Sequence, residues 1–279
     1  MTSIINRGIS LYKEKGARIL FQKAFDKIRR DIHDKLVVAR GQYSLNLDDI
    51  SVQFSAPTIT MVRRNQSRFE SEREEISDFV NMIEKSDVVY DIGANTGLYS
   101  LFAAQKCPEG QVISFEPYPP NLNLLKRDIA RNKIQNIKVV DVALSDTVGN
   151  VEFSQPAEED VGYGSASIES KMSKGTIKIP TTTGQRLIED GEIPAPNIVK
   201  IDVEGSEPLV IEGLEKALSA PRCRAVYCEV HLSGVDRRPS VDDFDSSPKE
   251  IRERLESYGF TVERVDDFSR TEITYKALK

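Results

Sequence analysis

The chain contains few of the residues that bind metals or form disulfides. Its 279 residues include three cysteines, two histidines and no tryptophan. Cys107, Cys223 and Cys228 form no CxxC pair, and their odd number does not indicate a disulfide framework. With so few ligands the composition argues against a structural zinc site. We therefore expect a reducing, cytoplasmic environment.

Long apolar runs are also missing. No segment approaches the roughly 18 apolar residues of a membrane-spanning helix, and the N-terminus lacks the apolar core of a secretory signal. The net charge is −6, from 38 Lys and Arg against 44 Asp and Glu, which argues against a nucleic-acid partner. The charge is unevenly distributed along the chain. Residues 1–40 hold ten Lys or Arg and four Asp or Glu, which gives them a net charge of +6, and the remainder carries −12.

Residues 1–65 are expected to form an N-terminal helical and small β extension. In residues 3–39 the apolar residues, such as Ile28, Ile32 and Leu36, recur at the spacing of one helix face. The other face of this predicted helix is basic. Two interpretations stay open: a helix that packs on the main domain or on a second subunit, as in a homodimer, and an amphipathic helix on an anionic membrane surface, which would place the protein at the inner membrane. The short pieces "YSLNL", "ISVQF" and "ITMV" predict a small β-region.

Residues 66–279 predict one α/β domain. Helices are expected at 70–84, 97–106, 119–132, 183–190, 206–219 and 248–258. They alternate with the apolar strands "VVYDI", "GQVISFEP", "IKVVDVAL", "NIVKIDV" and "RAVYCEV". This alternation predicts a parallel sheet covered on both faces. The last two strands, "FTVERV" and "EITYKAL", follow each other too closely for a helical crossover, so we expect an antiparallel hairpin at the sheet edge.

The turn "DIGANTG" after the first strand of this domain predicts a nucleotide site. A dinucleotide site would have GxGxxG spacing, whereas this turn has GxxxG and is preceded by Asp91. A carboxylate there fits a cationic ligand such as S-adenosylmethionine better than a pyrophosphate. Glu116 ends the second strand and can accept both ribose hydroxyls, while Asp141 is expected at the adenine amino group and Val142 against the ring.

The other residues of these two turns complete the expected cofactor site. They are Gly93, Ala94, Asn95, Thr96, Gly97 and Pro117.

The sequence resembles the FkbM-type methyltransferases from about Phe69 to about His231. The resemblance is carried by "DIGANTGLYSLFAA", "FEPYPPNLNLLKRDIARN", "VALSDTVGNVEF" and, most particularly, "NIVKIDVEGSEPLVIEGLEKAL". It implies a Rossmann-like class I fold with a seven-stranded, mostly parallel sheet and S-adenosylmethionine-dependent O-methylation. It also implies acceptors that include hydroxyls of sugars and of polyketide-type natural products.

Methyl transfer to a hydroxyl needs a base or a metal that removes the proton. The fourth strand ends in "KIDVEGSE" and the fifth in "YCEVHL". Asp202, Glu229 and His231 should converge at these neighbouring strand ends, and Lys200 is a fourth catalytic candidate. The cluster suits either a deprotonating dyad or a Mg²⁺ site with Asp202 and Glu229 as ligands. Glu204 and Glu207 could instead interact with the positive end of the dipole of the helix that follows.

A glycine-containing loop over residues 154–176 is expected to overhang the same edge. It offers Tyr163, Ser165 and Ser167 to a polar acceptor, or simply to solvent.

The sequence therefore predicts a cytoplasmic O-methyltransferase that acts on a hydroxyl of a sugar or glycan. The alternatives are an O-methyltransferase of a small-molecule natural product, a nicotinamide-dependent oxidoreductase and a cofactor-binding scaffold without catalysis.

Overall fold

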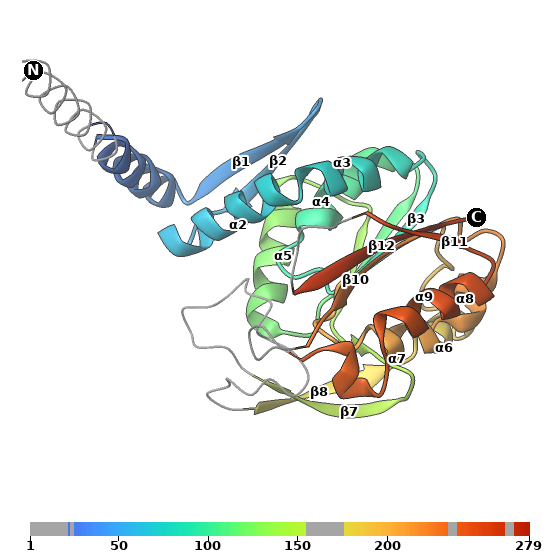
Figure 1. Ribbon diagram of the computed structural model, residues 1–279. Helices are drawn as coiled ribbons and strands as arrows, with labels where there is room; N and C mark the ends of the chain where they lie inside the picture. Colours follow the sequence, from blue (N-terminus) through green and yellow to red (C-terminus); the bar gives the residue numbers. More distant parts are fainter. Residues whose placement is uncertain (1–21, 23–24, 155–175, 234–238, 266–270) are drawn as a thin grey trace, which may run out of the picture.

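The computed structural model describes residue 22 and residues 25–154, 176–233, 239–265 and 271–279 (Figure 1). Its centre is a seven-stranded sheet in the order β11-β12-β10-β9-β3-β4-β5. The strands are β3 (Val88–Ile92), β4 (Gln111–Phe115), β5 (Ile137–Val140), β9 (Ile198–Ile201), β10 (Ala225–His231), β11 (Thr261–Arg264) and β12 (Glu272–Leu278).

Strand directions confirm the expected architecture. Neighbouring strands from β10 to β5 are all parallel, and β12 is antiparallel to both β10 and β11. The C-terminal hairpin is therefore part of the sheet, with β12 inserted beside β10 and β11 at the edge. The strands are short and apolar because both faces of the sheet are covered, and every residue of β9 is buried.

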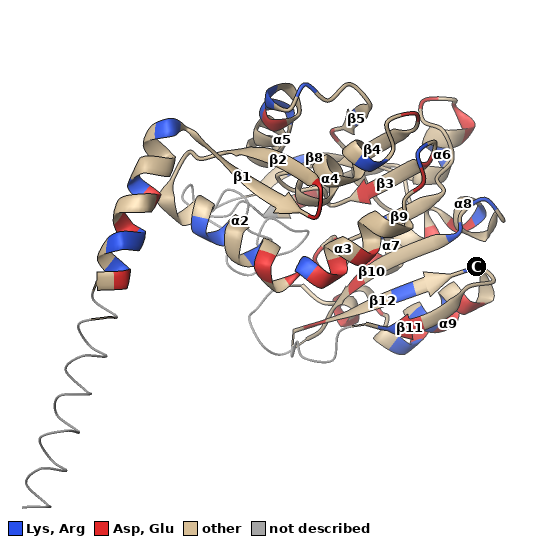
Figure 2. Cartoon of the chain, turned by 90° about the horizontal axis from the view of Figure 1, so that it is seen from above, with Lys and Arg blue, Asp and Glu red and all other residues tan. Residues whose placement is uncertain are grey.

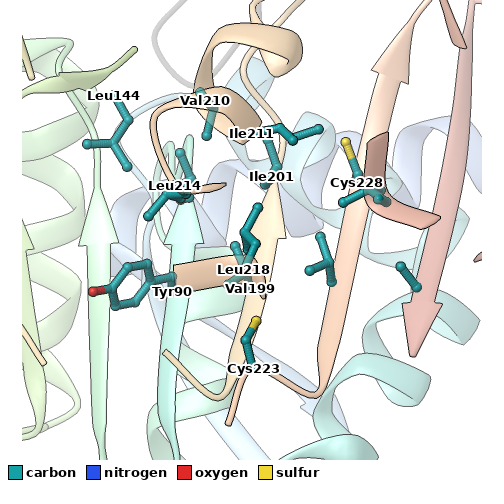
Figure 3. Packing of buried hydrophobic residues seen from close by; sticks show 14 of the residues in the cluster. Tyr90, Leu144, Val199, Ile201, Val210, Ile211, Leu214, Leu218, Cys223 and Cys228 are labelled. Carbon is teal, nitrogen blue, oxygen red and sulfur yellow. The ribbon is translucent and has the colours of Figure 1, made fainter. Parts of the chain in front are cut away.

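One face of the sheet is covered by four helices. These are α6 (Gly184–Glu189), α7 (Glu207–Glu212), α8 (Glu215–Ser219) and α9 (Pro248–Ser257). Figure 3 shows the packing, in which Val210, Ile211 and Leu214 meet Val199 and Ile201 of β9. The single helix expected over 206–219 is two helices, because the chain bends through Gly213, where an added Cβ would lie 2.0 Å from the Ser145 carbonyl oxygen.

The other face carries α2 (Ile59–Ser71), α3 (Arg73–Met82), α4 (Leu98–Lys106), α5 (Pro119–Arg131) and a two-stranded hairpin. The hairpin consists of β1 (Gln42–Leu47) and β2 (Ile50–Ser55). Its apolar side chains share one core with α3 and α4: Val52 and Phe54 of β2 are packed into the cluster that holds Phe79 and Phe102.

The expected domain boundary after residue 65 falls inside α2, and the prediction of a β-piece at "ITMV" is wrong. Thr58 caps α2 by accepting a hydrogen bond from the Met61 N–H at 3.2 Å, so the β-branched residues that follow enter a helix. The hairpin is tied to the main domain by Asp128 of α5, whose Oδ1 accepts from Ser55 N at 2.9 Å and from Ser55 Oγ at 2.6 Å. Residues 42–71 thus belong to the core of the α/β domain.

A small second sheet sits beside the central one. It contains β6 (Ala143–Leu144), β8 (Thr176–Thr182) and β7 (Gly149–Ser154), in that order. The expected third strand is therefore divided, since β5 ends at Val140 and β6 joins the small sheet. A short 3₁₀ turn, η2, spans Val241–Phe244. Tyr163, Ser165 and Ser167 lie outside the described residues.

At the N-terminal end, residues 25–40 form a helix that leads into β1. Within the described part of the chain, no helix is long and apolar enough to cross a membrane.

The shared core gives a test of where the domain begins. Phe54 is 1% exposed, so Phe54→Ala should lower the free energy of unfolding by about 3–5 kcal/mol in chemical denaturation. Phe25→Ala is the matched control at a position 66% exposed and should change it by less than about 0.5 kcal/mol. An unchanged denaturation midpoint for Phe54→Ala would show instead that the hairpin is a separate extension.

Candidate active site

A cavity of about 280 Å³ lies at the carboxyl ends of the parallel strands. In open α/β sheets this edge is where ligands bind. Its walls come from the turns after β3, β4 and β9, from the chain after β5, and from α2. The residues that line it on these elements are Ile92, Gly93, Asn95, Phe115, Glu116, Pro117, Val142, Ala143, Leu144, Asp202, Val203, Glu204, Arg64, Arg68 and Glu72.

The glycine turn lets three backbone segments meet at the cavity floor. Gly93 has φ +84°, and a Cβ on it would lie 1.8 Å from the Asp202 carbonyl oxygen. Its N–H and that of Ala94 both donate to the Phe115 carbonyl, at 3.0 and 2.9 Å. Gly97 has φ +90° and begins α4 where a Cβ would meet Leu125 at 2.5 Å. The turn after β3 is thus locked to β4 and β9 at positions that only glycine allows.

Glu116 is held rigidly at the cavity wall. Its two carboxylate oxygens accept from Asn95 N at 2.7 Å and from Tyr118 N at 2.8 Å. Burial raises the pKa of Glu116 to about 7, although both N–H donors favour the ionised form. The Asn95 side-chain oxygen is buried without a partner in this turn. An oriented acceptor pair and an unused amide oxygen fit a ligand with hydroxyl and amino donors.

Six other residues of the expected cofactor site lie in or beside these turns. Gly93, Pro117 and Val142 line the cavity, as Asn95 and Glu116 do. Ala94, Thr96 and Gly97 support the turn without lining the cavity.

Asp91 and Asp141 do not lie where direct cofactor contact would require. Asp91 is buried and turned toward α4, where its Oδ2 accepts from Ser100 Oγ at 2.5 Å. Asp141 is exposed and does not line the cavity. In this part of the chain the cavity is lined by the residues that follow, Val142, Ala143 and Leu144.

Asp202 is clamped by two cations from different elements. Its Oδ2 accepts from Lys200 Nζ at 2.9 Å and from Arg68 Nη2 at 2.7 Å, and Arg68 Nε also donates to Glu72 at 2.7 Å. Lys200 is only 2% exposed, and its ammonium lies 4.4 Å from the centre of the Tyr99 ring. This network joins β9 to α2 beneath the cavity.

The network fixes the charge of both partners. Burial alone would lower the pKa of Lys200, but the negative charges of Asp202 and Glu229 outweigh it and raise the pKa above its usual value. Burial opposes ionisation of Asp202 as well, yet Lys200 and Arg68 hold its pKa below the usual range. These interactions favour a protonated Lys200 and an ionised Asp202.

His231 lies among three carboxylates. Its Nδ1 is 2.8 Å from Glu207 Oε1, and its Nε2 is 3.4 Å from Glu204 Oε2 and 3.7 Å from Glu229 Oε1. Burial would lower the pKa of His231, but Glu204 and Glu207 outweigh burial and raise it well above the usual value. The surrounding carboxylates thus favour the protonated form of the imidazole. Burial, together with the negative charge of Asp202, raises the pKa of Glu229.

Asp202, Glu229 and His231 converge at the strand ends, with ligand atoms that all lie within 4.8 Å of one another. The surroundings of Asp202 nevertheless argue against a divalent metal on this carboxylate. Lys200 and Arg68 both donate to its Oδ2, and their positive charges would oppose a further cation there.

Sequence reasoning missed the contributions of α2 and of two buried partners. Arg68 and Glu72 are not among the predicted site residues, because the strand expected at "ITMV" conceals the start of α2, and the helix expected over 70–84 carries no sign that Glu72 faces the cavity. The helical spacing of Met61, Val62 and Phe69 is the signal that could have revealed this helix. Tyr99 lies in the glycine-turn motif and Glu207 at the end of "KIDVEGSE", but the contacts of Tyr99 with Lys200 and of Glu207 with His231 are not predicted from these motifs.

Known proteins resemble this chain over the part that builds the cavity. A family model described as the methyltransferase FkbM domain matches residues 91–262. Hexuronic acid methyltransferase AglP of Haloferax volcanii is 28% identical over 214 residues, which covers 77% of this chain and 84% of that protein. The 31-O-demethyl-FK506 methyltransferase FkbM of Streptomyces tacrolimicus is 28% identical over 220 residues, 68% of this chain and 80% of that protein.

Among solved structures, a crystal structure of methyltransferase FkbM from Methylobacillus flagellatus superposes with a TM-score of 0.47 at 17% identity. That superposition covers 70% of this chain and 44% of the other.

The family match spans the glycine turn, Glu116 and the strand ends with Asp202, Glu229 and His231. Membership implies S-adenosylmethionine as the methyl donor and decides against the nicotinamide alternative. The chain belongs to the methyltransferase FkbM domain family and is a methyltransferase.

Proposed function

We propose that this protein transfers a methyl group from S-adenosylmethionine to a hydroxyl of a sugar or glycan, with Glu229 as the base. The observation that carries the proposal is the position of Glu229. It lines the cavity beside Asp202, and its pKa is raised by burial and by that neighbouring charge. A carboxylate with a raised pKa is a stronger base, which suits the removal of a hydroxyl proton.

The first part of the cavity suits the donor. Glu116 would accept the ribose hydroxyls, Val142 would pack against the adenine, and the Gly93 turn would lie under the methionine portion. When bound, S-adenosylmethionine supplies an electrophilic methyl group on a sulfonium. The carboxylates of Glu72, Glu204 and Glu229 line the same cavity and favour such a cation.

The charged side chains around the acceptor would have different roles in the reaction. Glu229 takes the acceptor proton as the new oxygen–carbon bond forms, and the electrons of the broken carbon–sulfur bond stay on sulfur. His231 lies 3.7 Å from Glu229 Oε1, and when it is protonated its charge would compensate the surrounding carboxylates. Asp202 and Glu229 raise the pKa of Lys200, so Lys200 is not the base in this proposal. Asp202 is the fixed anion that helps to raise the pKa of Glu229 and so acts through that residue.

The shape of the neighbouring surface supports a polyhydroxyl acceptor. A groove of about 630 Å³ adjoins the cavity and shares Glu72, Glu229 and Glu272 with it. Further carboxylates and the hydroxyls of Ser71 and Thr274 line this groove, and such groups accept hydrogen bonds from sugar hydroxyls. The Haloferax relative is named for a hexuronic acid substrate, whereas the Streptomyces relative, named for a natural-product substrate, supports the small-molecule alternative.

Methyl transfer from labelled donor to uronic-acid-containing oligosaccharides tests both the acceptor and the base. An ether formed at a hydroxyl resists alkali, whereas an ester formed at a carboxylate is cleaved by it. We expect an alkali-stable product, a turnover that rises with pH as Glu229 loses its proton, and a loss of about 10²- to 10⁴-fold in turnover for Glu229→Gln.

The control is Glu263→Gln, the same change at an exposed position of β11, which should retain full turnover. A carboxylate acceptor is already ionised and needs no base. An alkali-labile product, formed at an undiminished rate by Glu229→Gln, would therefore contradict the proposal.

Donor binding should depend on the ionisation of Glu116. Because its pKa in the free protein is about 7, half of the molecules carry a protonated side chain there at that pH. Protonation removes acceptor capacity, so the affinity for S-adenosylmethionine, measured by calorimetry, should fall as the pH decreases through about 7. Glu116→Gln should bind more weakly and without this pH dependence. Equal affinities at pH values on both sides of 7, with the native side chain, would rule out Glu116 as the ribose acceptor.

A further inference from the structure

The helix of residues 25–40 exposes an apolar stripe to solvent. Phe25, Ile28, Ile32 and Leu36 follow one another at helical spacing and are 66%, 58%, 55% and 53% exposed. They are four of the six large apolar side chains that are exposed among the described residues. Isolated exposed apolar residues are ordinary, but an aligned row on one helix is typical of a binding surface.

In the second half of this helix, from Asp31 onward, the opposite face is bound to the domain. Asp34 and Val37 are buried there, and Arg63 of α2 donates to Asp34 Oδ2 at 2.6 Å and to Asp31 Oδ1 at 2.6 Å. These contacts fix the rotation of the helix about its axis. The stripe consequently faces away from the domain, on the helix that extends from the β1 and α2 side of the molecule (Figure 2).

Cations border the stripe on both sides. At about 100° per residue, Arg29 and Arg40 flank one edge of the row and Lys35 flanks the other, and all three are exposed. The acidic residues of the helix, which include the two bound by Arg63, lie about 100° or more from the centre of the stripe. The outward face is therefore apolar in the middle and positive at both margins.

We propose that this face docks on an anionic lipid bilayer. The apolar row would enter the boundary between headgroups and acyl chains, and the long side chains of Arg29, Lys35 and Arg40 would reach the lipid phosphates on either side. Juxtaposed anionic headgroups supply the negative charge that the helix itself lacks at its margins. The acidic remainder of the chain, with a charge of −12 outside residues 1–40, would be kept at a distance from the same surface.

A second copy of the chain is a less suitable partner. Two such helices packed stripe to stripe would oppose cations at both margins, and residues 25–40 place no acidic residue there to pair with them. Like charges at these flanking positions weaken helix–helix association.

Co-sedimentation of the full chain with vesicles tests the proposal. We expect binding to vesicles of phosphatidylcholine and phosphatidylglycerol in equal amounts, little binding to phosphatidylcholine alone, and release by added salt. The double substitution Ile28→Ser with Ile32→Ser should reduce binding at least tenfold, and so should Arg29→Gln with Arg40→Gln. The matched control, Lys27→Gln with Arg30→Gln, removes two cations on the side away from the stripe and should reduce binding less than Arg29→Gln with Arg40→Gln does.

Calorimetric binding of S-adenosylmethionine should be the same in all these variants, which shows that the domain stays folded. Absence of vesicle binding would overturn the proposal, and so would equal binding to neutral and anionic vesicles. A dimer in solution that Ile28→Ser with Ile32→Ser converts to a monomer would assign the stripe to a second copy instead.

Discussion

The active site depends on a buried ion cluster at the centre of the sheet. Asp202 ends the central strand β9 and is held between Lys200 of the same strand and Arg68 of α2. An unpaired charge at this depth would cost several kcal/mol. Each of the three charged side chains therefore depends on the other two for its buried position. The same cluster places α2 over the cavity and gives the base Glu229 a fixed negative neighbour.

The fold could be predicted from the sequence because its signals are local. Apolar strands such as "VVYDI" alternate with helices, and the short link between the last two strands requires an antiparallel pair. Glu116 was also predictable, since its place follows from a strand end. Asp141 was predicted from the same rule and directly follows its strand as Glu116 does, yet it is exposed and does not line the cavity. Arg68 could not be found this way, because its contact with Asp202 joins residues 134 positions apart.

Residue types alone leave the chemistry of part of the site open. Asp202, Glu229 and His231 have the composition of a metal site or of a histidine base, and the structure does bring them together. Their neighbours could not be predicted from residue types: two cations bind Asp202, and carboxylates surround His231. These neighbours are the reason for proposing Glu229 as the base.

A double-mutant cycle on Lys200→Met and Asp202→Asn tests most directly whether the buried ion cluster organises this site. Each single variant removes one partner of a buried charge and should lower the free energy of unfolding by about 3–5 kcal/mol. The double variant removes both charges, so it should be more stable than the sum of the single effects allows, by a coupling of about 1–3 kcal/mol. Effects that add within about 0.5 kcal/mol would contradict the central role of this pair.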